Sequence, residues 1–258
     1  MKVLSITNEK GGTGKTTLAV NLAAGLALRG HRVILVDADN QAHSTISMRI
    51  RPAPALYNLL INGASWEESL VFVPGENYGN HGEGQLFLLP SDESTRNIPV
   101  QMKSPLIIRD RFFELDDLVD VIIVDTSPSI TALHTGLYFA SHYIIYPTQC
   151  EYLSIAGLQR SLEHRAKAEQ VGKERNIPTA SVLAIVPNMF EGRESVQYQN
   201  LGWLKGKYGD DLVWPPIRKG TVWKQASQMR QPVFALDKSS KAAMEADRFV
   251  EAVERYLA

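Results

Sequence analysis

The sequence of 258 residues is 44% hydrophobic and 21% charged, which is typical of a folded globular chain and argues against intrinsic disorder. Its 27 basic and 28 acidic side chains give a formal net charge of −1, so any surface for nucleic acid or lipid has to arise from uneven placement of charge. The single cysteine, Cys150, excludes a disulfide framework and a cysteine-ligated zinc or iron–sulfur site built within one chain.

In chain order, short β-branched or aliphatic runs alternate with longer helical stretches, which is the pattern of a parallel sheet covered by helices. The predicted strands are Val3–Thr7, Val33–Val36, Leu86–Leu89, Val121–Val124, Tyr143–Tyr146 and Val182–Val186. The predicted helices are Thr16–Arg29, Ile107–Leu118, Thr131–Ala140, Ser154–Glu174 and Ser239–Leu257, and the turn formers of Pro74–Gly84 predict a surface loop. We expect one domain, residues 1–258, with a doubly wound, mostly parallel α/β sheet and no helix-turn-helix extension before Met1.

A glycine-rich segment lies between the first predicted strand and the first predicted helix. It reads Asn8-Glu9-Lys10-Gly11-Gly12-Thr13-Gly14-Lys15-Thr16-Thr17. The glycines permit a tight turn in which successive N–H groups point at phosphate oxygens, and the helix dipole adds positive potential. We expect Lys15 to reach the β- and γ-phosphates and the Thr16 hydroxyl to ligate Mg²⁺. The segment therefore predicts a nucleotide site with contacts from Lys10, Gly11, Gly12, Thr13, Gly14, Lys15, Thr16 and Thr17.

This segment departs from the general G-x-x-x-x-G-K-[ST] pattern of phosphate loops. Glu9 occupies the first glycine position, and a second lysine, Lys10, precedes the glycines. The variant K-G-G-T-G-K-T-T resembles the deviant Walker A motif of the ParA/MinD group of P-loop ATPases. The resemblance implies that Lys10 crosses a dimer interface to the phosphates of the partner's ATP. There it would neutralise the charge that develops during phosphoryl transfer.

Three acidic residues follow predicted strands. Asp37 and Asp39 point to the same side of an extended strand end, where paired carboxylates can hold Mg²⁺ and orient a water molecule, although turn or helix-cap carboxylates remain an alternative. Asp125 ends the apolar run Val121–Val124, the Walker B arrangement at the carboxyl end of a buried strand. The resemblance (V-D-x-D-x-Q) assigns Asp39 to the attacking water and Asp37 to the Mg²⁺ shell. The expected catalytic residues are thus Lys10, Lys15 and Asp39, and the expected metal ligands are Thr16, Asp37 and Asp125.

The residues around the nucleotide base are harder to identify. In the family, the segments that correspond to Asn188 and Pro216 flank adenine, so the resemblance implies base contacts from these two residues. The family reads D-T-P-P where this chain reads D-T-S-P, with Ser127 in place of one proline. The guanine-binding pattern N/T-K-x-D is absent from the sequence, which favours ATP over GTP. ATP and Mg²⁺ are the expected cofactors.

Two segments indicate the branch of the family. Asn8-Glu9-Lys10 and Pro147-Thr148-Gln149-Cys150-Glu151 resemble the chromosome- and plasmid-partitioning branch, ParA and Soj. That resemblance implies a slow, partner-stimulated ATPase that forms a homodimer with ATP and works with a ParB-like or cargo adaptor protein. It also implies a cytoplasmic, nucleoid-associated protein that positions a plasmid, a chromosome region or other cargo.

The residues from 193 to 230 concentrate positive charge. They include seven basic and three acidic side chains, a charge of +4, which leaves −5 for the remainder of the chain. Contacts of such residues with phosphates give nonspecific, salt-sensitive binding to DNA. Arg193, Lys219 and Lys224 are the expected DNA contacts by resemblance, although each can also be an ordinary solvated residue.

Three other functions remain open. One is a MinD-like positioning ATPase of the membrane surface. The acidic helix near the C-terminus argues against it, because anionic lipids repel negative charge. The second is a metabolic P-loop synthetase or amidase, which would need a substrate pocket in place of the dimer interface. The third is an ATP switch that does not hydrolyse the nucleotide.

Overall fold

The structure is a computed structural model that describes residues 1–79, 82, 84–192 and 195–257. Its strands are β1 (Lys2–Ile6), β2 (Arg32–Ala38), β3 (Val71–Phe72), β4 (Gln85–Leu89), β5 (Val121–Thr126), β6 (Tyr143–Thr148) and β7 (Ser181–Pro187). They form one sheet in the order β3-β4-β2-β5-β1-β6-β7. Every neighbouring pair is parallel except β3 with β4. The predicted doubly wound, mostly parallel fold is confirmed.

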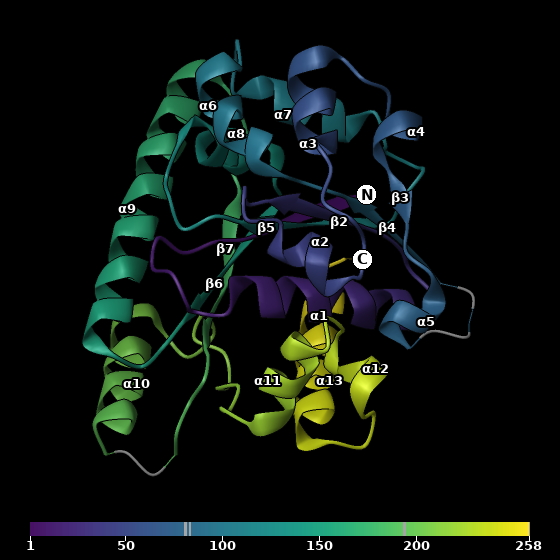
Figure 1. The fold of residues 1–258 in the computed structure, drawn as a ribbon. Helices are drawn as coiled ribbons and strands as arrows, with labels where there is room; N and C mark the ends of the chain where they lie inside the picture. Colours follow the sequence, from purple (N-terminus) through teal and green to yellow (C-terminus); the bar gives the residue numbers. More distant parts are fainter. Residues whose placement is uncertain (80–81, 83, 193–194, 258) are drawn as a thin grey trace.

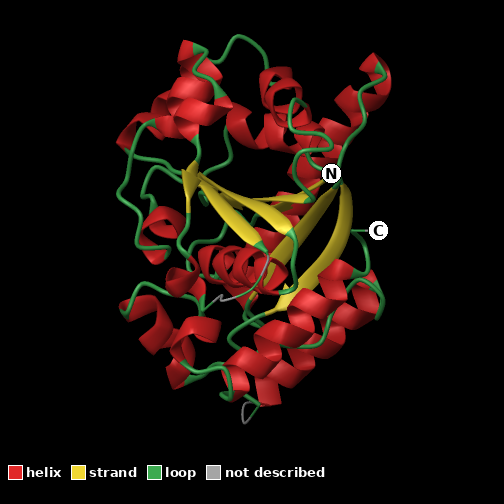
Figure 2. Ribbon diagram, turned by 90° about the vertical axis from the view of Figure 1, so that its right-hand side faces the viewer, coloured by secondary structure: helices red, strands yellow, loops and turns green. Residues whose placement is uncertain are grey.

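Helices cover both faces of this sheet. They are α1 (Lys15–Leu28), α2 (His43–Ser47), α3 (Ala55–Tyr57), the π-helix η1 (Asn58–Asn62), α4 (Trp66–Ser69), α5 (Gly75–Tyr78), the 3₁₀-helix η2 (Glu93–Asn97), α6 (Ile98–Gln101), α7 (Leu106–Phe113), α8 (Ala132–Ala140), α9 (Tyr152–Arg175), α10 (Ser195–Tyr208), α11 (Thr221–Gln228), α12 (Val233–Leu236) and α13 (Lys241–Glu254). Figure 1 shows α1 and α11 to α13 on one face, α3 and α6 to α8 on the other, and α9 beside β6 and β7. In Figure 2 the strands lie between these helical layers.

The central strands supply both hydrophobic layers by simple alternation. Val33 and Leu35 of β2 pack in the layer that contains α1 and α13, whereas Ile34 and Val36 pack in the layer that contains α7 and α8. Residues buried on both faces explain why these strands are apolar at nearly every position. The alternation fixes the register of each strand, because a shift by one residue would exchange the two faces.

The strand order places the functional loops together. β1 lies between β5 and β6, and the chain runs from β1 to one side first and returns to the other side later. In such sheets ligands bind where the order reverses, beyond the carboxyl ends of the strands. The loops after β1, β2 and β5 all leave the sheet at this edge. They carry the glycine-rich segment, Asp39 and Ser127.

The structure corrects two sequence predictions. The predicted helix Ile107–Leu118 ends at Phe113, and the chain then turns through Asp117, which has a left-handed φ of 69°. Within the predicted loop Pro74–Gly84, residues Gly75–Tyr78 form the helical turn α5. Asn77 anchors this turn by donating to the carbonyl of Met48 at 3.0 Å. Residues 80, 81 and 83 of that loop lie outside the described residues.

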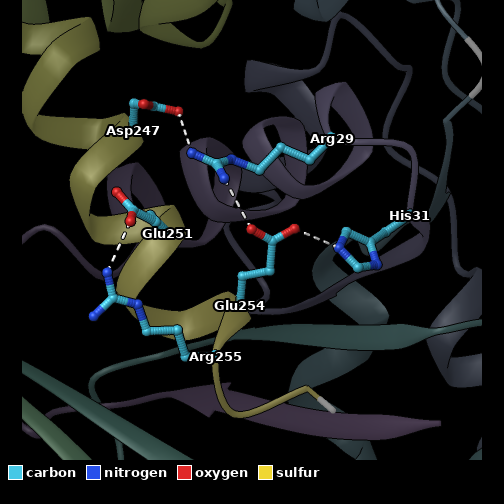
Figure 3. Close-up of polar contacts among 6 residues, drawn as sticks. All are labelled: Arg29, His31, Asp247, Glu251, Glu254 and Arg255. Carbon is cyan, nitrogen blue, oxygen red and sulfur yellow. Dashed lines mark hydrogen bonds and ion pairs between the residues drawn. The ribbon is translucent and has the colours of Figure 1, made fainter.

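The C-terminal helix α13 packs on α1 as an integral part of the fold. Its apolar face, which includes Phe249 and Val250, is buried, and a Cβ at Gly25 of α1 would lie 2.5 Å from Val250. At its polar edge, Arg29 pairs with Asp247 and Glu254 at 2.8 Å each, as Figure 3 shows. Helices of membrane-spanning length and hydropathy do not occur among the described residues.

Candidate functional site

The phosphate loop, residues 8–17, joins β1 to α1 through two glycines that need left-handed backbone. Gly12 has φ 76° and Gly14 has φ 90°, a conformation that is costly for any residue with a Cβ. Gly14 is restricted a second time, because a Cβ there would lie 2.2 Å from Nδ2 of Asn188. That amide nitrogen donates to the carbonyl of Thr13 at 2.8 Å. Asn188 therefore holds the loop against the segment that follows β7.

Lys15 lies inside the loop that precedes it. Its side chain is buried, and Nζ donates to the carbonyl oxygens of Asn8 at 3.0 Å and Lys10 at 3.3 Å. Burial lowers the pKa of Lys15, and the charges of Asp125 and Asp39 oppose that shift. An ammonium that is held by neutral carbonyls and poorly hydrated is well placed to bind a phosphate oxygen. This geometry fits the predicted role of Lys15.

Helix α9 supports the phosphate loop from the side. The backbone N–H of Glu9 donates to Oγ of Ser161 at 2.9 Å, and the Glu9 carboxylate pairs with Arg160 at 3.1 Å. The closest approach is at Gly157, where a Cβ would lie 2.8 Å from Cβ of Lys10. Among the described residues, no hydrogen bond or ion pair engages the Lys10 ammonium. The backbone of Lys10 is thus fixed while its charge remains uncompensated.

Asp37 and Asp125 are register partners on the neighbouring strands β2 and β5, and both are fully buried. Burial raises the pKa of Asp37, and burial together with the charge of Asp37 raises the pKa of Asp125 to about 7. Oδ2 of Asp125 accepts from the Ser44 hydroxyl at 2.8 Å. Its buried Oδ1 has no hydrogen-bond partner in the part of the chain that the structure describes.

These carboxylates fit a bound divalent cation. A cation, or water held by one, would satisfy Oδ1 of Asp125 and relieve the repulsion between the two acids. The Thr16 hydroxyl lowers the pKa of Asp125, against the rise that burial causes, so this hydroxyl lies close to the Asp125 carboxylate. Groups of three or more His, Cys, Asp or Glu that could hold a metal by themselves do not occur in the described ranges. A Mg²⁺ ion here would therefore need phosphate and water oxygens as well.

Asp37 and Asp39 have different partners from each other. Oδ2 of Asp37 accepts from the N–H and from the hydroxyl of Thr45, each at 2.8 Å, and Oδ1 accepts from the N–H of Asp39 at 3.2 Å. Asp37 therefore shapes the segment between β2 and α2, and its contact with Mg²⁺ stays a prediction. Oδ1 of Asp39 accepts from the N–H of Gln41 at 3.0 Å.

A cavity of about 490 Å³ opens above the phosphate loop. It is lined by Gly12, Gly14, Lys15, Thr16, Thr17, Asp39, Asn40, Gln41, His43, Ser127, Pro128, Ser129 and Met189. The structure thus gathers Lys15, Thr16 and Asp39 around one space, as predicted from the sequence. Asp39 is the one of the three acids that lines this cavity, which suits it to orient a water molecule there.

A second, mostly apolar cavity of about 380 Å³ continues past Thr17. Its lining includes Leu18, Asn188, Met189 and Trp223, so an apolar base stacked there would be shielded from water. Pro216 is not among the lining residues, and Arg218, two positions later, is. Asn188 thus lines this cavity and Pro216 does not, and base contacts from either residue stay a prediction.

Two of the expected DNA contacts, Lys219 and Lys224, also line this second cavity. Lys219 and Lys224 are exposed and line a hollow of about 430 Å³ together with Arg218. Lys219 also forms an ion pair with Glu191. Arg193 lies outside the described residues. The structure brings the two lysines together on one surface, and their contact with DNA stays a prediction.

Several residues of the site escaped the sequence analysis. Gln149 follows β6 and reaches the carbonyl of Gly12 at 3.4 Å. Ser44 bonds Asp125 from α2, and Met189 lines both cavities. Gln149 lies in the segment that resembles the partitioning branch, but that resemblance assigns it no role, and Ser44 belongs to no motif in the sequence. Their positions alone could have indicated them, because each lies within a few residues of the carboxyl end of a strand, where ligands bind in such sheets.

Comparison with known proteins identifies the family. A family described as an AAA domain matches residues 1–177. This chain belongs to that family. Together with its relatives, the AAA domain establishes a ParA/MinD-type P-loop ATPase. The resemblance seen in the phosphate loop is thereby confirmed.

Three known proteins illustrate the range of the similarity to this AAA-domain ATPase. The chromosome-partitioning ATPase Soj of Thermus thermophilus is 29% identical over 251 residues, which is 97% of this chain and 94% of Soj. The structure of apo McdA from Cyanothece has a TM-score of 0.81 at 22% identity, over 98% of this chain and 99% of McdA. The structure of cobyrinic acid a,c-diamide synthase from Mycobacterium smegmatis, with bound ADP and magnesium, has a TM-score of 0.79 at 25% identity. The match covers 99% of this chain and 95% of the synthase chain.

Proposed function

We propose that this ATPase dimerises on ATP, binds DNA without sequence preference and positions a plasmid, a chromosome region or other cargo with a ParB-like or cargo adaptor protein. The relatives support the coarser part, a positioning ATPase, because the similar chains include Soj. One observation carries the dimerisation on ATP, the step on which the rest of the proposal depends. Lys10 is fixed in its backbone beside the phosphate cavity, yet its ammonium is uncompensated within the described residues.

A second subunit would complete this arrangement. Lys10 packs by its Cβ against α9 at Gly157, and α9 begins with Tyr152 and Leu153, whose exposed fractions are 81% and 64%. Large apolar side chains this exposed beside a charged site are typical of a surface that is covered by a partner. A second copy that buries Tyr152 and Leu153 would bring its own Lys10 towards the phosphates across the interface.

The residues of the site have different roles in ATP hydrolysis. Lys15 binds the β- and γ-phosphates from within the loop, and Asp39 orients the attacking water. Thr16 and Asp125 would hold Mg²⁺, with Asp37 behind them. When bound, the ion neutralises charge on the phosphate oxygens. Lys10 of the partner subunit would add the charge that each subunit lacks by itself, so turnover is slow without the dimer.

Dimerisation is tested by light scattering after size exclusion, with Mg²⁺ and either ATP or a slowly hydrolysed analogue. We expect wild type and Asp39→Ala to be dimers, with Asp39→Ala persisting longer in ATP because it does not cleave the nucleotide. Lys10→Ala should stay monomeric. Lys238→Ala removes an exposed lysine in the turn before α13 and serves as the matched control, which should dimerise normally.

Two results would contradict the proposal. Wild type could remain monomeric with every nucleotide although it binds them, or Lys10→Ala could dimerise as wild type does. Either result would mean that Lys10 does not act between subunits, whatever the turnover.

The likeness to cobyrinic acid a,c-diamide synthase favours a second candidate, a synthetase that activates a small carboxylic acid with ATP. Turnover assays separate the two functions. A positioning ATPase hydrolyses ATP without a small substrate and is stimulated by DNA together with its partner. A synthetase needs a carboxylate and an amide-nitrogen donor, and DNA leaves its rate unchanged.

A further inference from the structure

A buried histidine contacts the segment that closes the phosphate cavity. His134 lies in the first turn of α8 with 2% of its surface exposed. Its Nε2 is 3.1 Å from the carbonyl oxygen of Ser127, and its Nδ1 is 3.5 Å from Oγ1 of Thr131. Because a carbonyl oxygen can only accept, Nε2 carries the ring proton. The ring is therefore a donor to Ser127.

The partner of this histidine belongs to the site. Ser127, Pro128 and Ser129 all line the phosphate cavity, and they follow β5 directly after Asp125 and Thr126. On the strand side, the Thr126 hydroxyl donates to the carbonyl of Ile6 at 2.9 Å. On the other side, the contact of His134 with Ser127 fixes where this segment turns towards α8.

The helix that carries His134 is a rigid base for it. At Gly136, two positions after the histidine, a Cβ would lie 2.6 Å from Cδ1 of Ile108 and 2.7 Å from the carbonyl of Pro105. At this point α8 thus packs directly on α7 and the residue before it. Leu133 and Leu137 on either side of His134 are buried in the same hydrophobic layer. A donor that is held this firmly also holds its acceptor.

We propose that His134 is a positioning residue for ATP hydrolysis. It keeps the Ser127 carbonyl turned to α8, so the partial negative charge of that oxygen stays away from the phosphate oxygens. Without the donor, this carbonyl is free to turn towards the cavity, where it repels the terminal phosphate and displaces the water that Asp39 orients. The proposal rests on the hydrolysis described above, and its measurement of hydrogen exchange without nucleotide depends on neither dimerisation nor DNA.

Two substitutions at position 134 separate positioning from packing. His134→Leu keeps a buried apolar side chain but has no donor, whereas His134→Gln places an amide N–H near the position of Nε2. We expect turnover of ATP by His134→Leu to fall about tenfold, while its affinity for ADP is unchanged. Amide hydrogen exchange of residues 126–131, measured without nucleotide, should become faster in His134→Leu. His134→Gln should restore both the turnover and the slow exchange.

A control in the same helix accounts for lost stability. Leu137→Ala removes buried apolar contact without touching Ser127, so it should lower the melting temperature and leave both turnover and exchange of residues 126–131 as in wild type. The proposal is overturned if His134→Leu retains wild-type turnover and exchange, or if His134→Gln behaves like His134→Leu. A wild type that is inactive on ATP would contradict the proposed function instead, and the exchange data would still decide the role of His134.

Discussion

Gly14 is the residue whose replacement the structure constrains most directly. Two separate restrictions act on it: its left-handed backbone, and the Nδ2 atom of Asn188, which would lie 2.2 Å from a Cβ at this position. Gly11, three positions earlier, has neither restriction, because a Cβ there would meet nothing within 4 Å. Position 14 therefore requires glycine, whereas position 11 leaves room for a methyl group.

We expect Gly14→Ala to destabilise the protein by about 2 kcal/mol or more, since it adds backbone strain and breaks the bond between Asn188 and Thr13. Gly11→Ala should leave the free energy of unfolding nearly unchanged. Urea unfolding without nucleotide measures both values. Equal stability of the two variants would show that the loop relaxes around position 14.

His134 makes stability depend on pH. Burial lowers its pKa from 6.5 to about 4, helped by Lys15 and His164 and opposed by the Ser127 carbonyl and Asp39. The unfolded chain thus binds a proton at this residue at a higher pH than the folded chain does. The stabilisation is fully present above pH 6.5 and is lost as pH falls towards 4, by up to about 3 kcal/mol.

His134→Gln does not titrate, so its free energy of unfolding should fall less than that of wild type between pH 6.5 and 4. Urea titrations at several pH values measure the difference between the two curves. Parallel curves would mean that His134 takes up its proton in the folded state as readily as in the unfolded chain.

At the scale of elements, α13 is held in two ways of unequal strength. Its apolar face is buried against α1, while its polar edge forms a partly exposed ion pair of Arg29 with Glu254 and a hydrogen bond between His31 and Glu254 (Figure 3). Burial of apolar area is worth more than ion pairs that water and salt screen. The packing at Val250, which touches the position of Gly25, should therefore dominate.

We expect Val250→Ala to lower the free energy of unfolding by about 2 kcal/mol. Arg29→Ala should lower it by less than about 1 kcal/mol, and by less still at high salt. Denaturant melts at low and high ionic strength compare the two variants. A larger loss in Arg29→Ala would show that the ion pairs, rather than the apolar face, hold the helix.

The elements that the sequence predicted well are those with a long, unambiguous pattern. The strands β1, β2 and β5 are apolar at nearly every position, and α1 follows a motif of specified residues. The many short helices between His43 and Gln101 were missed, because a helix of about one turn is too short to show a periodic pattern. Asn188 was assigned to the base from resemblance, but its bond to Thr13 joins residues far apart in the chain, which no local pattern can reveal.

At the scale of the whole molecule, positive charge is concentrated in one part of a chain that is nearly neutral. The exposed Lys219 and Lys224 lie there, but Glu191 pairs with Lys219 and competes with any phosphate for it. Removing an opposing carboxylate should therefore strengthen DNA binding, just as removing a lysine should weaken it.

Lys224→Ala should weaken binding to DNA of any sequence and reduce the salt slope by about 1, and Glu191→Gln should strengthen binding. Lys103→Ala, an exposed lysine outside this surface, is the matched control. Fluorescence anisotropy with labelled duplex, measured with ATP and Mg²⁺ over a range of salt concentrations, reports all three. Unchanged affinity in both Lys224→Ala and Glu191→Gln would place the DNA surface elsewhere.

Gly157 and Lys10 are far apart in the chain but pack against each other. A Cβ at position 157 would lie 2.8 Å from Cβ of Lys10, so only the hydrogen of glycine fits there. A methyl group at position 157 would push the lysine stem and, with it, the start of the phosphate loop. We therefore expect the effects of substitutions at these two positions on stability to be coupled rather than additive. A lineage that enlarges position 157 would have to adjust the neighbouring lysine as well, and with it the contact proposed between one subunit and the other.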